Sequence, residues 1–171
     1  MFFCDNGSGG GRRGSTTLPG QLALRGGKGS VLEGGIRVPA VLRWPGVIRA
    51  GTKCNQLISA QDLLPTFAAA AGIKLANQKP LDGVNCWPAI VQNRPMKRSP
   101  VIVAGPSGEF AVLHDQWKLI WDRQQISLFD VKEDPIEAHD VSVDHPLKVA
   151  ELADALAPLM IPPSGSNRQG R

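Results

Sequence analysis

Two short segments near the N-terminus carry side chains whose types and spacing could bind a metal ion or an anion. Asp5 and Asn6, followed by Gly7, come directly after the apolar residues 2–4, which read as the end of a buried strand. Ligands of open α/β sheets gather beyond the carboxyl ends of strands. A carboxylate beside an amide oxygen offers two hard donors, which suit Ca²⁺ or Mg²⁺ rather than zinc. The same tripeptide is also typical of a simple tight turn.

The second segment places Lys28 between Gly27 and Gly29. Glycines let a backbone approach a ligand closely, and a lysine ammonium acts as a point charge on an oxyanion. The alternative is a solvated surface lysine, the usual fate of this residue. Arg25 and Arg37 flank the segment and fit either an anion contact or ion pairs that support the loop.

Charge is distributed unevenly along the 171 residues. Residues 1–53 carry eight basic and two acidic side chains, residues 54–100 carry five and two, and residues 101–171 carry six and eleven. A basic N-terminal third indicates an anionic ligand. Aromatic residues are only 5% and Tyr is absent, so the chain has few side chains on which the bases of a single-stranded nucleic acid could stack. We therefore expect a small anionic substrate and no nucleic acid.

The N-terminal part predicts an α/β fold with a long connecting loop. Residues 5–35 contain eleven glycines and read as a loop, and residues 36–43 read as a second strand, irregular or at an edge because of Pro39. Residues 62–71 read as a helix with Asp62 as its N-cap and Gly72 just past its end.

The C-terminal part predicts a small antiparallel meander and then a helix. Four apolar or alternating runs are separated by turn-like stretches, and the spacing of apolar residues over 146–159 indicates an amphipathic helix. We predict a domain over 1–95, a subdomain over 96–161 and a flexible tail over 162–171. No apolar run approaches the ~18 residues of a membrane span. The predicted strands are 101–104, 109–114, 117–121 and 126–131.

Several blocks of residues follow one another along nearly the whole chain. They are Asp5-Asn6-Gly7, residues 24–29, 33–39 and 44–46, Asp62 to Thr66, Asp82-Gly83-Val84, and 117–120 with 128–130 and 134–135. In this order the blocks resemble the C-terminal portion of the type I sulfatase family, the arylsulfatase-like branch of the alkaline phosphatase superfamily. The resemblance implies the tail of a large mixed sheet flanked by helices, then a small antiparallel sheet with a terminal helix.

The resemblance also implies roles for three residues. Asp5 and Asn6 fall where sulfatases hold a divalent cation, usually Ca²⁺, and Lys28 falls where the family places a catalytic lysine on the substrate sulfate. Family members hydrolyse sulfate esters with a formylglycine made from a Cys/Ser-x-Pro-x-Arg motif. That motif is absent here, because Ile90 stands where Cys86-Trp-Pro would need Arg. We therefore expect the chain alone to be inactive and to depend on the missing N-terminal part of a sulfatase. A periplasmic, secreted or lysosomal-type location is the family expectation.

Three alternatives stay open. A non-catalytic interaction module or inactive truncated product would carry these residues without chemistry. A phosphatase-like relative would use the same Asp/Asn metal edge. Gly9 to Gly14 match the Gly-x-Gly-x-x-Gly pattern of dinucleotide binding, with Glu33 roughly where a ribose-binding acid would stand, but residues 15–20 contain Pro and Gly in place of the helix that this pattern must open.

Overall fold

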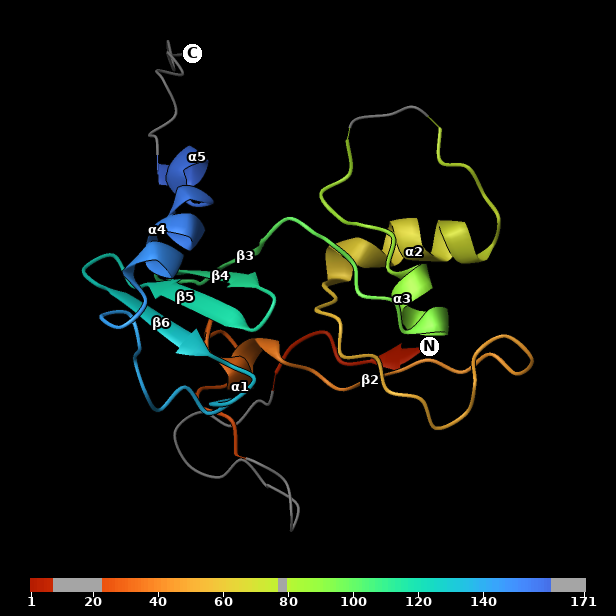
Figure 1. Ribbon diagram of the computed structural model, residues 1–171, viewed down its shortest axis with the longest axis horizontal. Helices are drawn as coiled ribbons and strands as arrows, with labels where there is room; N and C mark the ends of the chain where they lie inside the picture. Colours follow the sequence, from red (N-terminus) through yellow and green to blue (C-terminus); the bar gives the residue numbers. More distant parts are fainter. Residues whose placement is uncertain (8–22, 77–79, 161–171) are drawn as a thin grey trace, which may run out of the picture. The chain divides into compact units, whose positions relative to one another are not determined.

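The computed structural model describes residues 1–7, 23–76 and 80–160 (Figure 1). The chain divides into two compact units, one of residues 1–5 and 38–101 and the other of residues 6–37 and 102–171. Residues 6–37 therefore group with the C-terminal sheet, whereas the sequence suggests a simple division at residue 95. The Gly9–Gly14 pattern and the predicted tail from residue 162 lie outside the described residues.

The first unit contains a two-stranded antiparallel sheet. β1 (Phe2–Phe3) pairs with β2 (Ala40–Val41), with Phe2 opposite Val41. The strand predicted over 36–43 is thus much shorter, because Ile36 ends a helix and only two residues pair with β1. Pro39 has no backbone N–H and so takes part only through its carbonyl oxygen, which accepts from the Cys4 N–H at 3.4 Å.

The helices of the first unit are organised around Asp62. A 3₁₀ turn, η1 (Ala60–Asp62), leads into α2 (Leu63–Ala70), and Gly72 comes after it with φ of 67°, the left-handed conformation that ends many helices. Asp62 stands at the N-cap position of α2, as predicted, but its side chain makes no cap bond to that helix, and Ser59 caps η1. The Asp62 carboxylate is instead fully buried and reaches back to the Ser59 N–H at 2.7 Å.

A second short helix, α3 (Trp87–Gln92), completes the first unit. Its N-terminal neighbour Cys86 is fully buried, and the Cys86 N–H donates to Thr66 Oγ1 of α2 at 2.9 Å. Burial raises the pKa of the Cys86 thiol. Cys86 is therefore a packed structural cysteine.

The second unit is built on a four-stranded antiparallel sheet in the order β3-β4-β5-β6, as the meander predicted (Figure 1). Side chains alternate between the two faces of each strand. Val112, Leu119 and Leu128 lie opposite one another across β4, β5 and β6 and share one face. The strands are β3 (Val101–Ala104), β4 (Phe110–His114), β5 (Trp117–Trp121) and β6 (Ile126–Asp130).

One face of this sheet is covered by α4 (Pro146–Asp154), which inserts Leu152 and, just beyond its end, Leu156 into the core with Val112, Leu119 and Leu128. Burying five such side chains stabilises the unit by roughly 1.5–3 kcal/mol each. The helix predicted over 146–159 is interrupted after Asp154 and resumes as α5 (Ala157–Met160). No helix in the described part of the chain is long and apolar enough to cross a membrane.

The opposite face of the sheet meets the glycine-rich segment. α1 (Glu33–Ile36) is a single turn whose Glu33, Gly34 and Gly35 are buried. Lys118 of β5 belongs to this face, since it alternates with Leu119, and it is completely buried. The glycine-rich segment of residues 25–37 therefore packs directly against this face of the sheet, where Glu33 meets Lys118.

Candidate functional site

The structure places Asp5 and Asn6 where the chain passes from the first unit to the second. Asp5 is exposed and closes the first segment of the first unit, while Asn6 is half-buried and opens the second unit. The next residue, Gly7, donates its N–H to the carbonyl oxygen of Gly35 at 2.9 Å. Gly7 is thus hydrogen-bonded to the end of the glycine-rich segment that carries Lys28.

The loop around Lys28 is folded by its own backbone. The Ser30 N–H donates to the Gly27 oxygen at 3.0 Å, and the Gly34 N–H donates to the Arg25 oxygen at 2.7 Å. Lys28 lies at the exposed tip of this structure. Among the residues that the structure describes, no carboxylate forms an ion pair with Lys28. The positive charge of Lys28 is therefore not neutralised by any carboxylate among the described residues.

The two flanking arginines are used differently. Arg37 pairs with the Glu33 carboxylate and also reaches the Val131 carbonyl oxygen at 3.4 Å. Arg25 donates to the backbone oxygen of Glu137 and lies over the Phe129 ring, 6.0 Å from its centroid. These contacts match the supporting use of arginine weighed from the sequence.

Beneath the loop lies a cluster of buried charges that the sequence did not reveal. The Lys118 ammonium is 3.0 Å from Glu33 Oε1 and 2.7 Å from Glu137 Oε1. Glu137 Oε2 accepts from the Glu33 N–H at 2.9 Å. Glu137 Oε1 accepts no well-aligned hydrogen bond in the described part of the chain, so Lys118 neutralises it by proximity of charge. The sequence signal that could have revealed this cluster is Lys118 itself, a charged residue inside the apolar run of β5.

Asp5 and Asn6 can be tested as ligands of a divalent cation by the type and number of oxygen donors that they supply. The Asp5 carboxylate and the Asn6 amide are hard ligands of the kind that Ca²⁺ and Mg²⁺ prefer. Within residues 1–7, 23–76 and 80–160 there is no group of three or more His, Cys, Asp or Glu side chains suited to a metal. The pair fits a divalent cation in type but supplies only part of the six to eight oxygens that Ca²⁺ takes.

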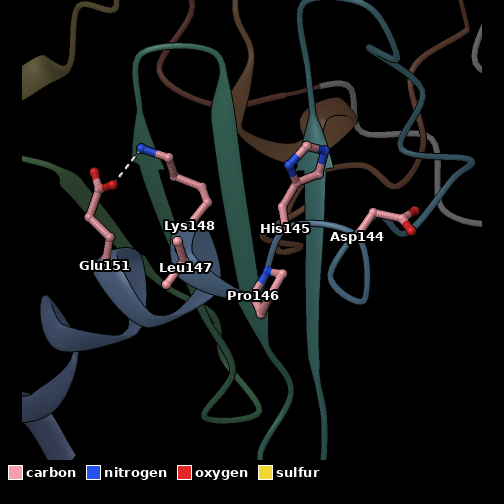
Figure 2. Close-up of a pocket in the computed structure, with 6 residues that line it drawn as sticks. All are labelled: Asp144, His145, Pro146, Leu147, Lys148 and Glu151. Atoms are coloured by element: carbon pink, nitrogen blue, oxygen red, sulfur yellow. Dashed lines mark hydrogen bonds and ion pairs between the residues drawn. The ribbon is translucent and has the colours of Figure 1, made fainter.

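Two surface hollows in the second unit contain none of the predicted site residues. One, of about 340 Å³, lies at the start of α4, where Lys148 is paired with Glu151 and so offers no free cation to an anion (Figure 2). The other, of about 410 Å³, is lined by Arg25, Leu32 and polar side chains of the sheet, among them Ser127. Neither hollow is a deep cavity at the predicted site.

The segment with His139, Asp140 and His145 forms a polar loop. Asp140 accepts from the Leu128 N–H at 3.0 Å and from the Ser142 N–H at 2.9 Å. Burial alone would raise the pKa of Asp140, but these backbone donors outweigh it and lower the pKa. His145 packs against Trp117, with ring centroids 4.8 Å apart. The Asp140 carboxylate therefore serves the loop backbone.

Comparison with known proteins identifies the family. The family model described as "N-sulphoglucosamine sulphohydrolase, C-terminal" matches residues 27–160. Steryl-sulfatase of Homo sapiens is 46% identical over 66 residues, covering 39% of this chain and 11% of that protein. Arylsulfatase A of Bos taurus is 39% identical over 117 residues, covering 66% of this chain and 23% of that protein. The chain thus spans less than a quarter of the length of these two relatives.

A solved structure agrees with the sequence relatives. The crystal structure of Ps i-CgsB superimposes with a TM-score of 0.78 at 34% identity, covering 92% of this chain and 35% of that one. The chain therefore belongs to the sulfatase C-terminal family, and the resemblance and the fold class inferred from sequence are confirmed. Lys28 lies within the matched residues, whereas Asp5 and Asn6 precede them.

Proposed function

We propose that Asp5, Asn6 and Lys28 form the C-terminal edge of a sulfatase active site, in a protein that hydrolyses sulfate esters. The observation that carries the proposal is the exposed position of Lys28. It lies on a glycine-rich loop held by its own backbone hydrogen bonds, within a segment that matches the sulfatase C-terminal family. Arg25 and Arg37 are already engaged in contacts, so Lys28 is the cation of this loop best suited to contact the substrate sulfate.

Lys28 acts by electrostatic stabilisation in this proposal. A sulfate ester is anionic, and negative charge shifts to the leaving oxygen as the S–O bond breaks. A fixed ammonium beside the sulfate favours that distribution of charge over the ground state, and removal of one such group typically costs about 10²–10³ in rate. The glycines at 27 and 29 leave room for the substrate to approach the backbone.

Asp5 and Asn6 are proposed as two ligands of a divalent cation, Ca²⁺ or less favourably Mg²⁺. When bound, such an ion acts as a Lewis acid toward a sulfuryl oxygen. The exposed Asp5 carboxylate and the adjacent Asn6 amide support the role by donor type. The remaining ligands and the formylglycine nucleophile would come from a segment other than these 171 residues, which contain no Cys/Ser-x-Pro-x-Arg motif.

We also propose that the segment that supplies the nucleophile and the remaining metal ligands packs against the first unit. A two-stranded sheet is marginally stable by itself. Both strands here are exposed, and Phe2 and Val41 present large apolar side chains. Further strands of a sulfatase domain would cover them. By family resemblance, such a protein would work in the periplasm, outside the cell or in a lysosome-type compartment.

The test begins with the source DNA upstream of the Met1 codon. An in-frame Cys/Ser-x-Pro-x-Arg motif is expected, and the protein that includes it should hydrolyse an aryl sulfate. Lys28→Ala should lower kcat/KM about 10²–10³-fold, while Lys53→Ala, the matched control outside the loop, should not. A larger kcat/KM for the corresponding phosphate ester would favour the phosphatase-like alternative. Unchanged kcat/KM in Lys28→Ala would refute the role of Lys28.

A further inference from the structure

We infer that the buried cluster of Glu33, Lys118 and Glu137 is a positioning device that fixes the Lys28 loop on the sheet. The inference rests on the proposed function, because it treats Lys28 as the group that meets the substrate. It assigns a role in substrate recognition to three residues that are themselves buried away from solvent.

Burial makes this cluster unusual. Lys118 and Glu137 are 0% exposed and Glu33 is 2% exposed. Lysine and glutamate are almost never fully buried unless paired. Here two carboxylates meet the Lys118 ammonium, and Arg37 supplies the second positive charge through Glu33. The cluster is therefore balanced, with two negative and two positive side chains.

The chain path links the cluster to Lys28 over a short distance. Glu33 is five residues beyond Lys28. The intervening backbone is closed on itself, since the Ser30 N–H donates to Gly27, the Leu32 N–H donates to Ser30 Oγ, and the Gly34 N–H donates to Arg25. A displacement of Glu33 would therefore be transmitted to the tip of the loop.

The loop is also attached to the segment that carries Glu137. Arg25 donates to the Glu137 carbonyl oxygen, and Arg37 donates to the Val131 carbonyl oxygen. Glu137 adopts φ of 55°, a conformation uncommon for a residue with a side chain. The same residue thus contacts Lys118 and Glu33 through its carboxylate and Arg25 through its backbone.

General energetics favour a positional role over a purely stabilising one. Well-packed apolar side chains of similar volume often stabilise a site as much as a buried ion cluster does. Ion pairs and hydrogen bonds add direction, which selects one arrangement of the groups that make them. A glycine-rich loop has little side-chain packing of its own, so such fixed contacts are what hold its tip in one place.

The first experiment uses amide hydrogen exchange on the 171-residue chain. Lys118→Met with Glu137→Gln removes one positive and one negative charge, so the double variant stays balanced. Exchange at the bonded amides of Gly34, Gly35 and Arg37 should become about tenfold faster, the effect of losing a charged hydrogen bond. Amides of β4 and β5 should change much less. Equal acceleration in loop and sheet would mean a purely global effect and would overturn the inference.

The second experiment is a double-mutant cycle in the active protein that contains these residues. The Lys118/Glu137 double variant should lower kcat/KM for an aryl sulfate about tenfold, and by much less in a Lys28→Ala background, because coupled groups are non-additive. Lys132→Ala, which removes one partner of an exposed ion pair, is the control. Multiplicative losses would show that the cluster acts independently of Lys28 and would overturn the inference.

The two proposals fail in distinguishable ways. Unchanged kcat/KM in Lys28→Ala refutes the role proposed for Lys28, and the role of the cluster in recognition falls with it, whatever the exchange shows. A full effect of Lys28→Ala with loop exchange unaltered in the double variant leaves the proposed function intact and refutes the positioning device alone.

Discussion

The amide of Gly7 and the carbonyl oxygen of Gly35 form a hydrogen bond of 2.9 Å. The approach is so close that a Cβ on Gly7 would lie 1.9 Å from the Gly34 oxygen and 2.7 Å from the Gly35 carbonyl carbon. Sequence alone favoured a tight turn for this glycine. In the structure, Gly7 instead lies against the backbone of Gly34 and Gly35.

Gly7→Ala should therefore break this contact between the backbones of Gly7 and Gly35. The added methyl would meet backbone atoms, and such overpacking costs about 1–3 kcal/mol of unfolding free energy. Urea unfolding measures the loss, and amide exchange at residue 7 reports the broken hydrogen bond. Gly29→Ala is the control, since nothing lies within 4 Å and only its φ of 86° opposes a side chain. Retained protection of the residue-7 amide in Gly7→Ala would contradict the close contact.

The regular elements of the second unit were predictable from local pattern. The apolar runs of β4 and β5, separated by the Asp115-Gln116 turn, predicted the hairpin, and the structure pairs His114 with Trp117 on either side of that turn. Leu152 follows the helical period onto the core. Leu147 follows the same period but is 86% exposed, because it lies at the start of α4, away from the five-residue core.

The features that the sequence did not predict depend on contacts between residues that are distant in sequence. Lys118 and Glu33 are 85 residues apart, and no local pattern signals their pairing. Asp62 stands at the predicted N-cap position, yet its side chain pairs with Arg98, which is 36 residues away. The candidate site residues Asp5, Asn6 and Lys28 came from resemblance and residue chemistry, and their roles stay predictions.

Arg98→Met should strongly destabilise the first unit. Arg98 Nη1 lies 2.6 Å from Asp62 Oδ2, and the two side chains are 3% and 0% exposed. Breaking a buried pair by removing one partner leaves a buried charge and costs about 3–5 kcal/mol. Urea unfolding monitored by the fluorescence of Trp44 and Trp87, which pack 5.5 Å apart in that unit, measures the cost. The exposed pair Lys132–Glu133 provides the comparison, where Lys132→Ala should cost less than about 1 kcal/mol. Equal costs at both sites would argue against a buried pair.

The same aspartate predicts a pH dependence. Burial would raise the pKa of Asp62, but the Ser59 N–H, the Arg98 guanidinium and the Val84 N–H together lower it below the ordinary 3.8. A carboxyl whose pKa is lower in the folded state stabilises the protein above its unfolded pKa, and that contribution is lost as pH falls through the folded value. The difference in unfolding free energy between wild type and Asp62→Asn should therefore be full at pH 7 and shrink below about pH 4. A difference that stays constant between pH 7 and pH 3 would exclude this linkage.

Calcium binding by the 171-residue chain gives a last prediction. Asp5 and Asn6 offer two side-chain oxygens, whereas Ca²⁺ takes six to eight, so water must fill the rest and the affinity should be weak, with Kd of about 10⁻³ M or above. Isothermal titration with CaCl₂ measures it, and Asp5→Asn should abolish even this weak binding because it removes the only charge of the pair. Asp82→Asn, an exposed acid elsewhere in the first unit, is the matched control and should leave the titration unchanged. Saturable micromolar binding that survives Asp5→Asn would place the calcium ligands elsewhere in the chain, and the two-ligand edge proposed for a sulfatase would have to be abandoned.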